Sequence, residues 1–311
     1  MHTHPHAHDH HHAHDHIARN ARLGRAFAVG IALNVAFVAA EVICGLMANS
    51  LALVADAAHN FSDVVGLVLA WGASALAQRP PSARFTYGLR GSTILAALAN
   101  AMLLLVVTGG IAWEAVLRFK NPDTLNTTLM IWVALAGIII NGATAWLFMA
   151  DRKSDLNVRG AYLHMAADAG VSLGVAIAGA GIFLTGWLWL DPAASLLIVA
   201  TIFAGTWGLL RDSVKLALHA APENVDPDAV RRYLRALTGV TEVHDLHIWA
   251  MSTTETALTA HLVIPAGHPG DEFLAQVVSE IEHNFQIGHA TLQIETGAAE
   301  NPCALAPDHV V

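Results

Sequence analysis

Two short runs of residues pair a histidine with an aspartate inside apolar segments of the chain. His59 and Asp63 form the first pair, and His164 and Asp168 form the second. A separation of four residues places both side chains of a pair on one helix face, one turn apart. Ionisable side chains are costly at membrane depth and therefore indicate function. Two imidazoles and two carboxylates can surround one divalent ion tetrahedrally, which is the arrangement that Zn²⁺ prefers. The pattern predicts a metal site within a membrane.

The charges of these four side chains favour transport over storage. Two carboxylates cancel the charge of a divalent ion, which makes its burial tolerable. Protons compete with metal for the imidazole nitrogens, and histidine titrates near physiological pH. The same ligands can therefore carry either Zn²⁺ or protons, as an antiporter requires. The alternative interpretation is a buried polar network that joins two helices, but two copies of one ligand pattern favour the metal site.

Asp56 lies on the same helix face as the first pair, three residues before His59. Metal-bound histidines usually donate their second ring N–H to an outer partner such as a carboxylate. Asp56 is a candidate for that partner, and a structural hydrogen bond is the alternative.

The composition is typical of a membrane protein with a soluble acidic part. The chain is 55% hydrophobic and 13% charged, against about 25% charged in an average soluble protein. Residues 1–211 hold 12 Lys and Arg and 11 Asp and Glu, whereas residues 212–311 hold 4 and 14. This balance disfavours nucleic acid as a partner, because nucleic-acid binding needs basic patches. The two cysteines, Cys44 and Cys303, provide neither a disulfide framework nor a thiolate zinc motif.

Six apolar segments each have the roughly 20 residues that are needed to cross a bilayer. The first follows a basic stretch and runs for too long, and with too many polar residues, to be the core of a signal peptide. We therefore interpret it as a retained helix. The predicted spans are about 26–47, 51–77, 92–116, 127–149, 160–184 and 187–209.

The loops between these spans predict the orientation of the protein. Eleven Lys and Arg lie on the side that holds both termini, and only Arg118 and Lys120 lie on the other side. Cytoplasmic loops carry an excess of these residues. Both termini and the soluble domain are therefore expected in the cytoplasm, and the composition is compatible with the inner (plasma) membrane of a bacterium.

The soluble domain is expected to be small and of mixed α and β structure. A helix begins at Asp226-Pro227 with acidic residues in its first turn, and alternating residues predict strands at 240–250 and 257–264. A second helix at 271–285 and a strand at 290–294 complete the order α-β-β-α-β. The fold class is thus an α-helical membrane protein with six transmembrane helices and a C-terminal α+β cytoplasmic domain. The predicted domains are 1–25, 26–211 and 212–297, followed by a tail at 298–311.

Taken together, these motifs resemble the cation diffusion facilitator family over residues 20–297. The resemblance rests on the run Ser50–Asp63 in the second span, on His164–Asp168 in the fifth, and on two further runs, Tyr87-Gly88-Leu89-Arg90 and Val243-His244-Asp245-Leu246-His247-Ile248-Trp249. It implies that the protein is a homodimer that exports Zn²⁺, and often Cd²⁺ or Co²⁺, from the cytoplasm in exchange for protons. It also implies that the protein is not an enzyme. Many members carry a Glu at the start of the third span, near residues 91–93, where this chain has none.

The resemblance also implies a regulatory metal site in the cytoplasmic domain, formed in some relatives by residues matching His244, His261 and Glu295. These side chains suit zinc, although surface histidines without such a role are common. His247 is separated from His244 by an odd number of residues, which predicts opposite strand faces and excludes His247 from that site. Gln293 stands where a relative can use a histidine ligand.

The N-terminal arm, residues 1–25, begins with nine histidines interleaved among Ala, Asp, Thr and Pro up to position 16. Such a segment cannot fold alone. A purification tag is one origin, but tags are usually unbroken runs of histidine. We favour a native arm that collects metal weakly and raises its local concentration.

Two other classes of function deserve comparison with transport. A membrane-bound metal sensor or metal-binding protein without transport would use the arm and the cytoplasmic domain, and would not need ligands at membrane depth. An intramembrane zinc hydrolase would typically need His-Glu-x-x-His on one helix, a run that is absent from the sequence. It would also need an open coordination position for water.

Overall fold

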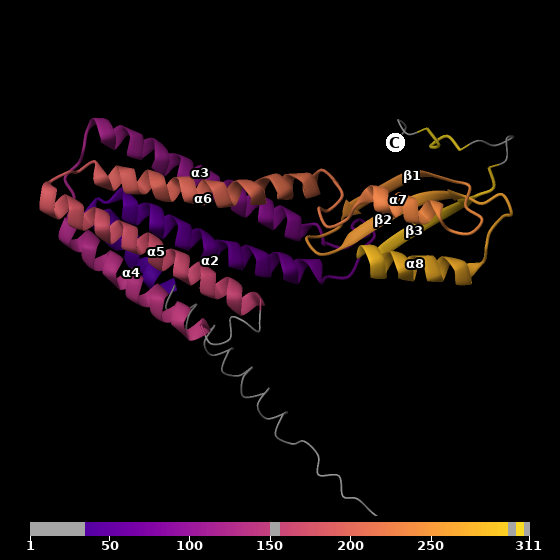
Figure 1. Cartoon of the computed structure of the whole chain (residues 1–311), viewed down its shortest axis with the longest axis horizontal. Coiled ribbons are helices and arrows are strands. Elements are labelled where there is room, and N and C mark those ends of the chain that lie inside the picture. Colours follow the sequence, from indigo (N-terminus) through magenta and orange to yellow (C-terminus); the bar gives the residue numbers. More distant parts are fainter. Residues whose placement is uncertain (1–34, 150–155, 298–302, 308–311) are drawn as a thin grey trace, which may run out of the picture. The chain divides into compact units, whose positions relative to one another are not determined.

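The computed structural model describes residues 35–149, 156–297 and 303–307 (Figure 1). Five helices are long and apolar enough to cross a membrane, and a shorter apolar helix, Val35–Ala48, precedes them. The predicted first span is thus described only from Val35 onward, and the count of six spans stays a prediction. The arm at 1–25 and most of the tail at 298–311 lie outside the described residues. The five helices are α2 (Leu51–Ala77), α3 (Ser92–Lys120), α4 (Thr127–Phe148), α5 (Leu156–Thr185) and α6 (Leu190–Ala217).

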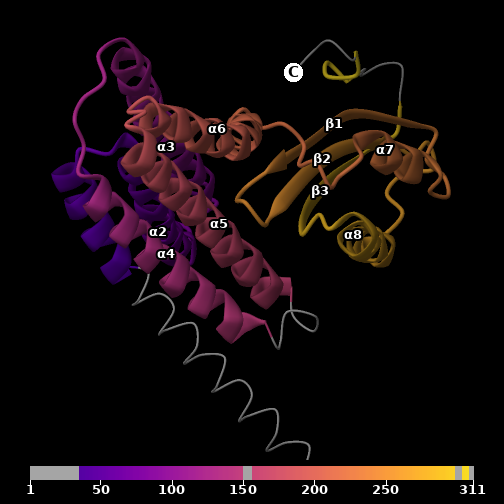
Figure 2. The ribbon, with the colours of Figure 1, turned by 60° about the vertical axis from the view of Figure 1, so that its left-hand side comes forward.

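The chain divides into two compact units, which we describe separately. The helical unit comprises the described residues up to Val65 together with Leu103–Gly205. In it α4 and α5 lie side by side (Figures 1 and 2). Its core is made of small and medium apolar side chains, among them Ala52, Leu53, Met130 and Val175. Large apolar side chains such as Leu184 are exposed, as expected for helices that face lipid.

One buried carboxylate fixes the start of α2 within the helical unit. Asp191, in the first turn of α6, is fully buried. It accepts hydrogen bonds from the Ser50 hydroxyl at 2.5 Å and from the backbone N–H groups of Leu51 at 2.8 Å and Ala52 at 3.2 Å. The first N–H groups of a helix have no partner inside it, and the positive end of the helix dipole favours an anion. Asp191 therefore caps α2 from another helix.

The second unit comprises Gly66–Met102 and the chain from Thr206 onward. In this unit the Arg90 guanidinium donates to Glu255 at 2.7 Å, and the Thr253 backbone N–H donates to the Thr93 hydroxyl at 3.0 Å. Gly88, just before Arg90, has a φ of +71°, and a Cβ there would meet the Arg79 carbonyl at 3.0 Å. The sequence run Tyr87–Arg90 thus forms a tight turn that presents Arg90 to the loop that holds Thr253 and Glu255.

The soluble part of the second unit has the predicted order α-β-β-α-β (Figure 2). The elements are α7 (Pro227–Arg235), β1 (Glu242–Ala250), β2 (Thr256–Val263), α8 (Asp271–Phe285) and β3 (His289–Glu295). The sheet order is β1-β2-β3, with β1 antiparallel and β3 parallel to β2. Residues of α7, α8 and β2, including Val230, Leu258 and Ile281, share one core, so both helices cover the same face of the sheet.

The contacts of Asp191 generate a prediction about stability. Replacing Asp191 by Asn removes the negative charge at the N-terminus of α2 and should lower the free energy of unfolding by about 1–2 kcal/mol. The melting temperature of the purified protein in detergent measures the effect. Asp123→Asn is the control. Asp123 is exposed, and its ion pair with Arg118, 3.7 Å away, should contribute little to stability. Equal melting temperatures for the two variants would contradict the proposed role of Asp191.

Candidate metal centres

The helical unit brings the two predicted His–Asp pairs together from α2 and α5. The Asp63 carboxylate is central: its Oδ2 lies 3.9 Å from His59 Nε2 and 3.3 Å from His164 Nε2. His164 Nε2 lies 3.7 Å from Asp168 Oδ2. His59, Asp63 and His164 offer ligand atoms that all lie within 4.8 Å of one another. Asp168 stands outside this tight group and adjoins it through His164.

These separations can be compared with those around a zinc ion. With bonds of about 2.0–2.1 Å, two nitrogen or oxygen ligands of a tetrahedral zinc lie about 3.3 Å apart. The three distances are 3.3, 3.7 and 3.9 Å. Within the described part of the chain, Asp63 Oδ2 and Asp168 Oδ2 are buried and accept no hydrogen bond. Buried carboxylate oxygens without a donor fit a cation as their partner.

Asp56 has other contacts than the predicted one. It is buried, and its Oδ2 accepts a hydrogen bond from the Ser172 hydroxyl of α5 at 3.3 Å. His59 Nδ1 is buried and makes no hydrogen bond with the residues that the structure describes. The expected hydrogen bond that orients His59 is therefore not formed by Asp56. The spacing places Asp56 on the face of α2 that carries His59, but its neighbours are Ser172 of α5 and Glu41 of the preceding helix.

Asp56 belongs to a second pair of carboxyl groups beside the metal ligands. Its carboxyl group is a close neighbour of that of Glu41, which is fully buried on the helix Val35–Ala48. The Asn60 amide donates to Glu41 Oε2 at 3.2 Å. Two like charges buried close together disfavour the doubly ionised form. The pair is therefore a candidate proton-binding group, and its Asp56 is three residues before His59.

The soluble domain brings together the three residues expected at a cytoplasmic site. His244 on β1 is directly opposite His261 on β2, and Val263 of β2 is paired with Glu295 of β3. His244 Nε2 lies 3.3 Å from Glu295 Oε2, and His261 Nδ1 lies 2.9 Å from Glu295 Oε1. Gln293 donates to Glu295 at 2.9 Å instead of joining the group.

Cys303 is a member of this group that the sequence did not reveal. Its Sγ lies 3.6 Å from His261 Nδ1, and the potential ligand atoms of His244, His261, Glu295 and Cys303 all lie within 4.8 Å of one another. The cysteine is in the tail, eight positions after Glu295. No strand or motif spacing links it to the histidines, so only the tertiary structure identifies it.

The acid–base properties of this group reflect its contacts. Burial acts to raise the pKa of the Glu295 carboxyl, but hydrogen bonds from Cys303 and Gln293 and the two nearby histidines bring that pKa below its ordinary value. The Leu305 backbone acts to lower the pKa of the Cys303 thiol, but desolvation and the Glu295 and Asp245 carboxylates raise it overall. An ionised carboxylate and a protonated thiol are the resulting forms at neutral pH.

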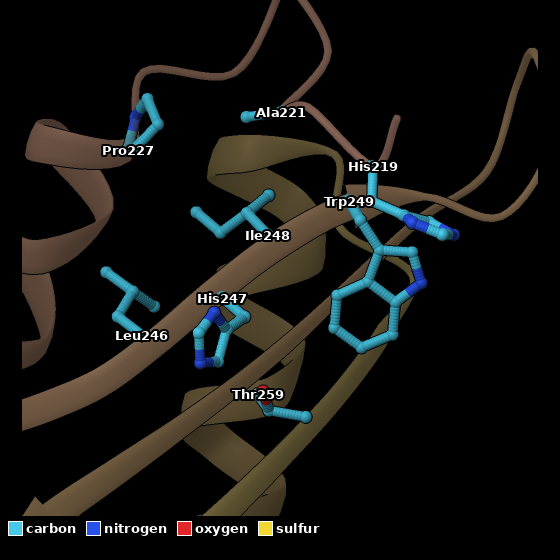
Figure 3. A pocket seen from close by; sticks show the side chains of 8 residues that line it. All are labelled: His219, Ala221, Pro227, Leu246, His247, Ile248, Trp249 and Thr259. Carbon is cyan, nitrogen blue, oxygen red and sulfur yellow. The ribbon is translucent and has the colours of Figure 1, made fainter. Parts of the chain in front are cut away.

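His247 lies on the same side of the sheet as the cluster, contrary to the prediction from its spacing. The pairing of β1 with β2 shifts register between His244 and His247, and Asp245 within this bulge has a φ of +47°. His247 is therefore opposite Thr259, which shares a strand face with His261. His247, Thr259 and Trp249 line a hollow whose volume is about 570 Å³, and Figure 3 shows these side chains. His247 forms a hydrogen bond with Asp245 at 2.8 Å. It is not part of the cluster of His244, His261, Glu295 and Cys303.

Two family models match consecutive parts of the chain. The model described as "Cation efflux transmembrane domain" matches residues 27–216. The model described as "Cation efflux protein, cytoplasmic domain" matches residues 222–297.

Curated relatives match most of the chain. It is 40% identical to the "Metal cation efflux system protein CzcD" of Cupriavidus metallidurans over 89% of this chain and 88% of that protein. It is 37% identical to the "Zinc transporter ZitB" of Escherichia coli over 86% of this chain and 85% of the relative. The "Cadmium, cobalt and zinc/H(+)-K(+) antiporter" of Bacillus subtilis is 34% identical over 85% of this chain and 86% of its own length.

The central place of Asp63 generates a prediction about metal binding. Asp63→Ala removes the carboxylate that adjoins both histidines and leaves the charge of a bound dication only partly cancelled. The purified variant should lose the zinc that is bound at the membrane site. Elemental analysis after dialysis measures this loss. His247→Ala should keep the zinc content of the unmodified protein. Full zinc content in Asp63→Ala would exclude this carboxylate as a ligand.

Proposed function

This chain belongs to the cation efflux family, also called the cation diffusion facilitators, and we propose that it exports Zn²⁺ from the cytoplasm in exchange for protons. The names of the relatives share metal transport, and that of the Cupriavidus metallidurans protein specifies metal cation efflux. The observation that carries the proposal is the cluster of His59, Asp63 and His164, with Asp168 beside it, between two helices long and apolar enough to cross a membrane.

The ligand set supports zinc as the main cargo. Imidazole nitrogen suits Zn²⁺ and its neighbours in the transition series, whereas Mg²⁺, Ca²⁺ and Mn²⁺ prefer sites made of oxygen atoms alone. Two carboxylates cancel the charge of the dication in a low-dielectric surrounding. Cd²⁺ and Co²⁺ fit the same ligands, and both appear in the name of the Bacillus subtilis relative.

Two features support protons as the exchanged ion. Metal and protons compete for the same imidazole nitrogens, so loading one releases the other. In addition, the neighbouring carboxyl groups of Glu41 and Asp56 disfavour being ionised together, so this pair can hold a proton apart from the metal ligands, and its Asp56 is three residues before His59 on α2. We propose that this pair gives up its proton while metal occupies the site.

The protein is an integral membrane protein, and we propose a homodimer in a bacterial inner membrane. The match to the cytoplasmic-domain model of the family supports dimerisation. The uneven distribution of Lys and Arg supports cytoplasmic termini. The histidine-rich arm, which lies outside the described residues, then meets metal on the side from which it leaves.

The cytoplasmic cluster supports a second proposal, a regulatory zinc site at His244, His261 and Glu295. Both ring nitrogens of His244 are buried without a hydrogen bond in the described structure, although Nε2 lies 3.3 Å from Glu295. A buried imidazole without a partner is costly. A metal ion bound to one nitrogen would satisfy it.

A membrane-bound sensor without transport is the remaining alternative function, and transport itself decides between them. In proteoliposomes with an acidic interior, Zn²⁺ uptake should exceed uptake without a pH gradient, because protons leave as metal enters. A protonophore should remove the difference, and Asp63→Ala should take up no more zinc than protein-free vesicles. Uptake that ignores the gradient would contradict proton exchange, and no uptake by the unmodified protein would favour the sensor.

The Glu41–Asp56 pair generates a separate prediction. Glu41→Gln keeps a hydrogen-bonding side chain but removes one carboxyl group from the pair. Exchange of labelled for unlabelled Zn²⁺ across vesicles at equal pH should stay near the unmodified rate, while acceleration by a pH gradient should be lost. Glu114→Gln is the control, since Glu114 pairs with Arg118 on α3 and is 46% exposed. If Glu41→Gln still responds to the gradient as Glu114→Gln does, the pair is not the proton carrier.

A further inference from the structure

The C-terminal tail supplies one side chain to the cytoplasmic cluster, which is otherwise made by the sheet. We propose that the thiolate of Cys303 is the fourth ligand of a tetrahedral site completed by His244, His261 and Glu295, and that the bound metal thereby fastens the tail to the sheet. This inference rests on the proposed cytoplasmic site and adds a ligand that changes its chemistry. The metal expected is Zn²⁺ or another thiophilic divalent ion.

Two distances within the cluster match the ligand separations of a four-coordinate zinc. With a Zn–S bond of about 2.3 Å and a Zn–N bond of about 2.0 Å, tetrahedral geometry separates sulfur from nitrogen by about 3.5 Å. Cys303 Sγ lies 3.6 Å from His261 Nδ1. The same geometry separates nitrogen from oxygen by about 3.3 Å, and His244 Nε2 lies 3.3 Å from Glu295 Oε2. The shorter 2.9 Å contact of His261 Nδ1 with Glu295 Oε1 would lengthen slightly around an ion.

His244 provides an observation independent of the cysteine. It is 4% exposed, and neither of its ring nitrogens makes a hydrogen bond with the described residues. Its Nε2 approaches Glu295 without the alignment of a hydrogen bond. Ligands of one ion have this relation, because each points at the shared centre and not at its neighbour. The neighbouring ring of His261 is oriented on its other side by Asp245, whose Oδ2 lies 3.3 Å from His261 Nε2.

The charges and polarizability of the four side chains select the metal. One carboxylate and one thiolate cancel a divalent charge, and two neutral imidazoles complete the set. Metal binding displaces the proton of the thiol. A thiolate suits Zn²⁺ and Co²⁺ and disfavours Mg²⁺, Ca²⁺ and Mn²⁺, which take oxygen ligands. The site therefore discriminates in favour of the metals that the membrane ligands also suit.

The position of Cys303 gives the site a mechanical consequence. His244, His261 and Glu295 come from β1, β2 and β3, so the sheet alone fixes them. Cys303 lies beyond β3 in the described tail segment 303–307. Binding of metal therefore joins the tail to all three strands, and release of metal frees it.

Cobalt spectroscopy of the full-length protein in detergent tests the assignment. A thiolate bound to Co²⁺ gives an intense charge-transfer absorption in the near ultraviolet, which imidazole and carboxylate ligands do not give. We expect this absorption in the unmodified protein and in Cys44→Ser, and its loss in Cys303→Ser. Cys44 is the matched control, because it is the only other cysteine and lies in the apolar helix Val35–Ala48. An equal absorption in Cys303→Ser would overturn the proposal.

Further outcomes separate the ligand from the site. Cobalt bound to the unmodified protein without the charge-transfer absorption would overturn the role of Cys303 and leave the three-residue site standing. A charge-transfer absorption that appears at the same cobalt concentrations in His244→Ala as in the unmodified protein would place the metal elsewhere and overturn the cytoplasmic site itself. Losing one ligand should weaken zinc binding at this site by at least about tenfold, since loss of even an outer partner costs 10–100-fold.

Alkylation of the thiol provides a second measurement that does not depend on cobalt. In the Cys44→Ser background, Cys303 is the only thiol, and Zn²⁺ should slow its reaction with a maleimide, whereas Mg²⁺ should not. Adding His244→Ala should remove the protection by zinc. Reaction rates that zinc leaves unchanged would overturn the proposal even if Cys303→Ser proved to be poorly folded.

Discussion

The capping of α2 by Asp191 is the contact on which the membrane ligands depend. The carboxylate binds the first N–H groups of α2 and the hydroxyl of Ser50, and thereby fixes where this helix begins. His59 follows Leu51 by eight residues, or about 12 Å along a helix axis, and Asp63 follows one turn later. An ionised group buried at this position is tolerable because the helix terminus supplies its donors. The level of the α2 ligands relative to α6 follows from this contact.

Two pairs of carboxyl groups with different partners adjoin each other in the helical unit. Asp63 and Asp168 are near histidines and keep oxygen atoms that accept no hydrogen bond in the described residues. Asp56 and Glu41 instead lie close to each other and accept hydrogen bonds from Ser172 and Asn60, respectively. Three of these four carboxylates are buried, and leaving them all ionised without counter-charge would be costly. One pair is suited to hold a cation and the other a proton, which is the physical basis for exchange between them.

The soluble domain obtains its metal ligands from strand pairing and from an irregularity in that pairing. The register of β1 and β2 places His244 against His261, and the bulge at Asp245 turns His247 to the same side of the sheet. Asp245 then contacts both His247 and His261. The bulge therefore supplies the acidic partner that orients a ligand, and it also directs His247 toward the hollow beside Trp249 and away from the cluster.

The sequence by itself determined the features that follow from local periodicity. Spans of apolar residues predicted the helices, the four-residue spacing placed His59 with Asp63 and His164 with Asp168, and the alternation in the soluble domain predicted the order α-β-β-α-β. Only the tertiary structure decided contacts between segments distant in sequence. It placed Asp56 beside Glu41 and Ser172 and not in a hydrogen bond with His59. It also made Asp191 the cap of α2, and it placed Cys303 next to His244 and His261. The reason is physical: helix and strand periods fix which side of its own segment a residue faces, but bulges, helix ends and returning tails follow from packing, which no local pattern records.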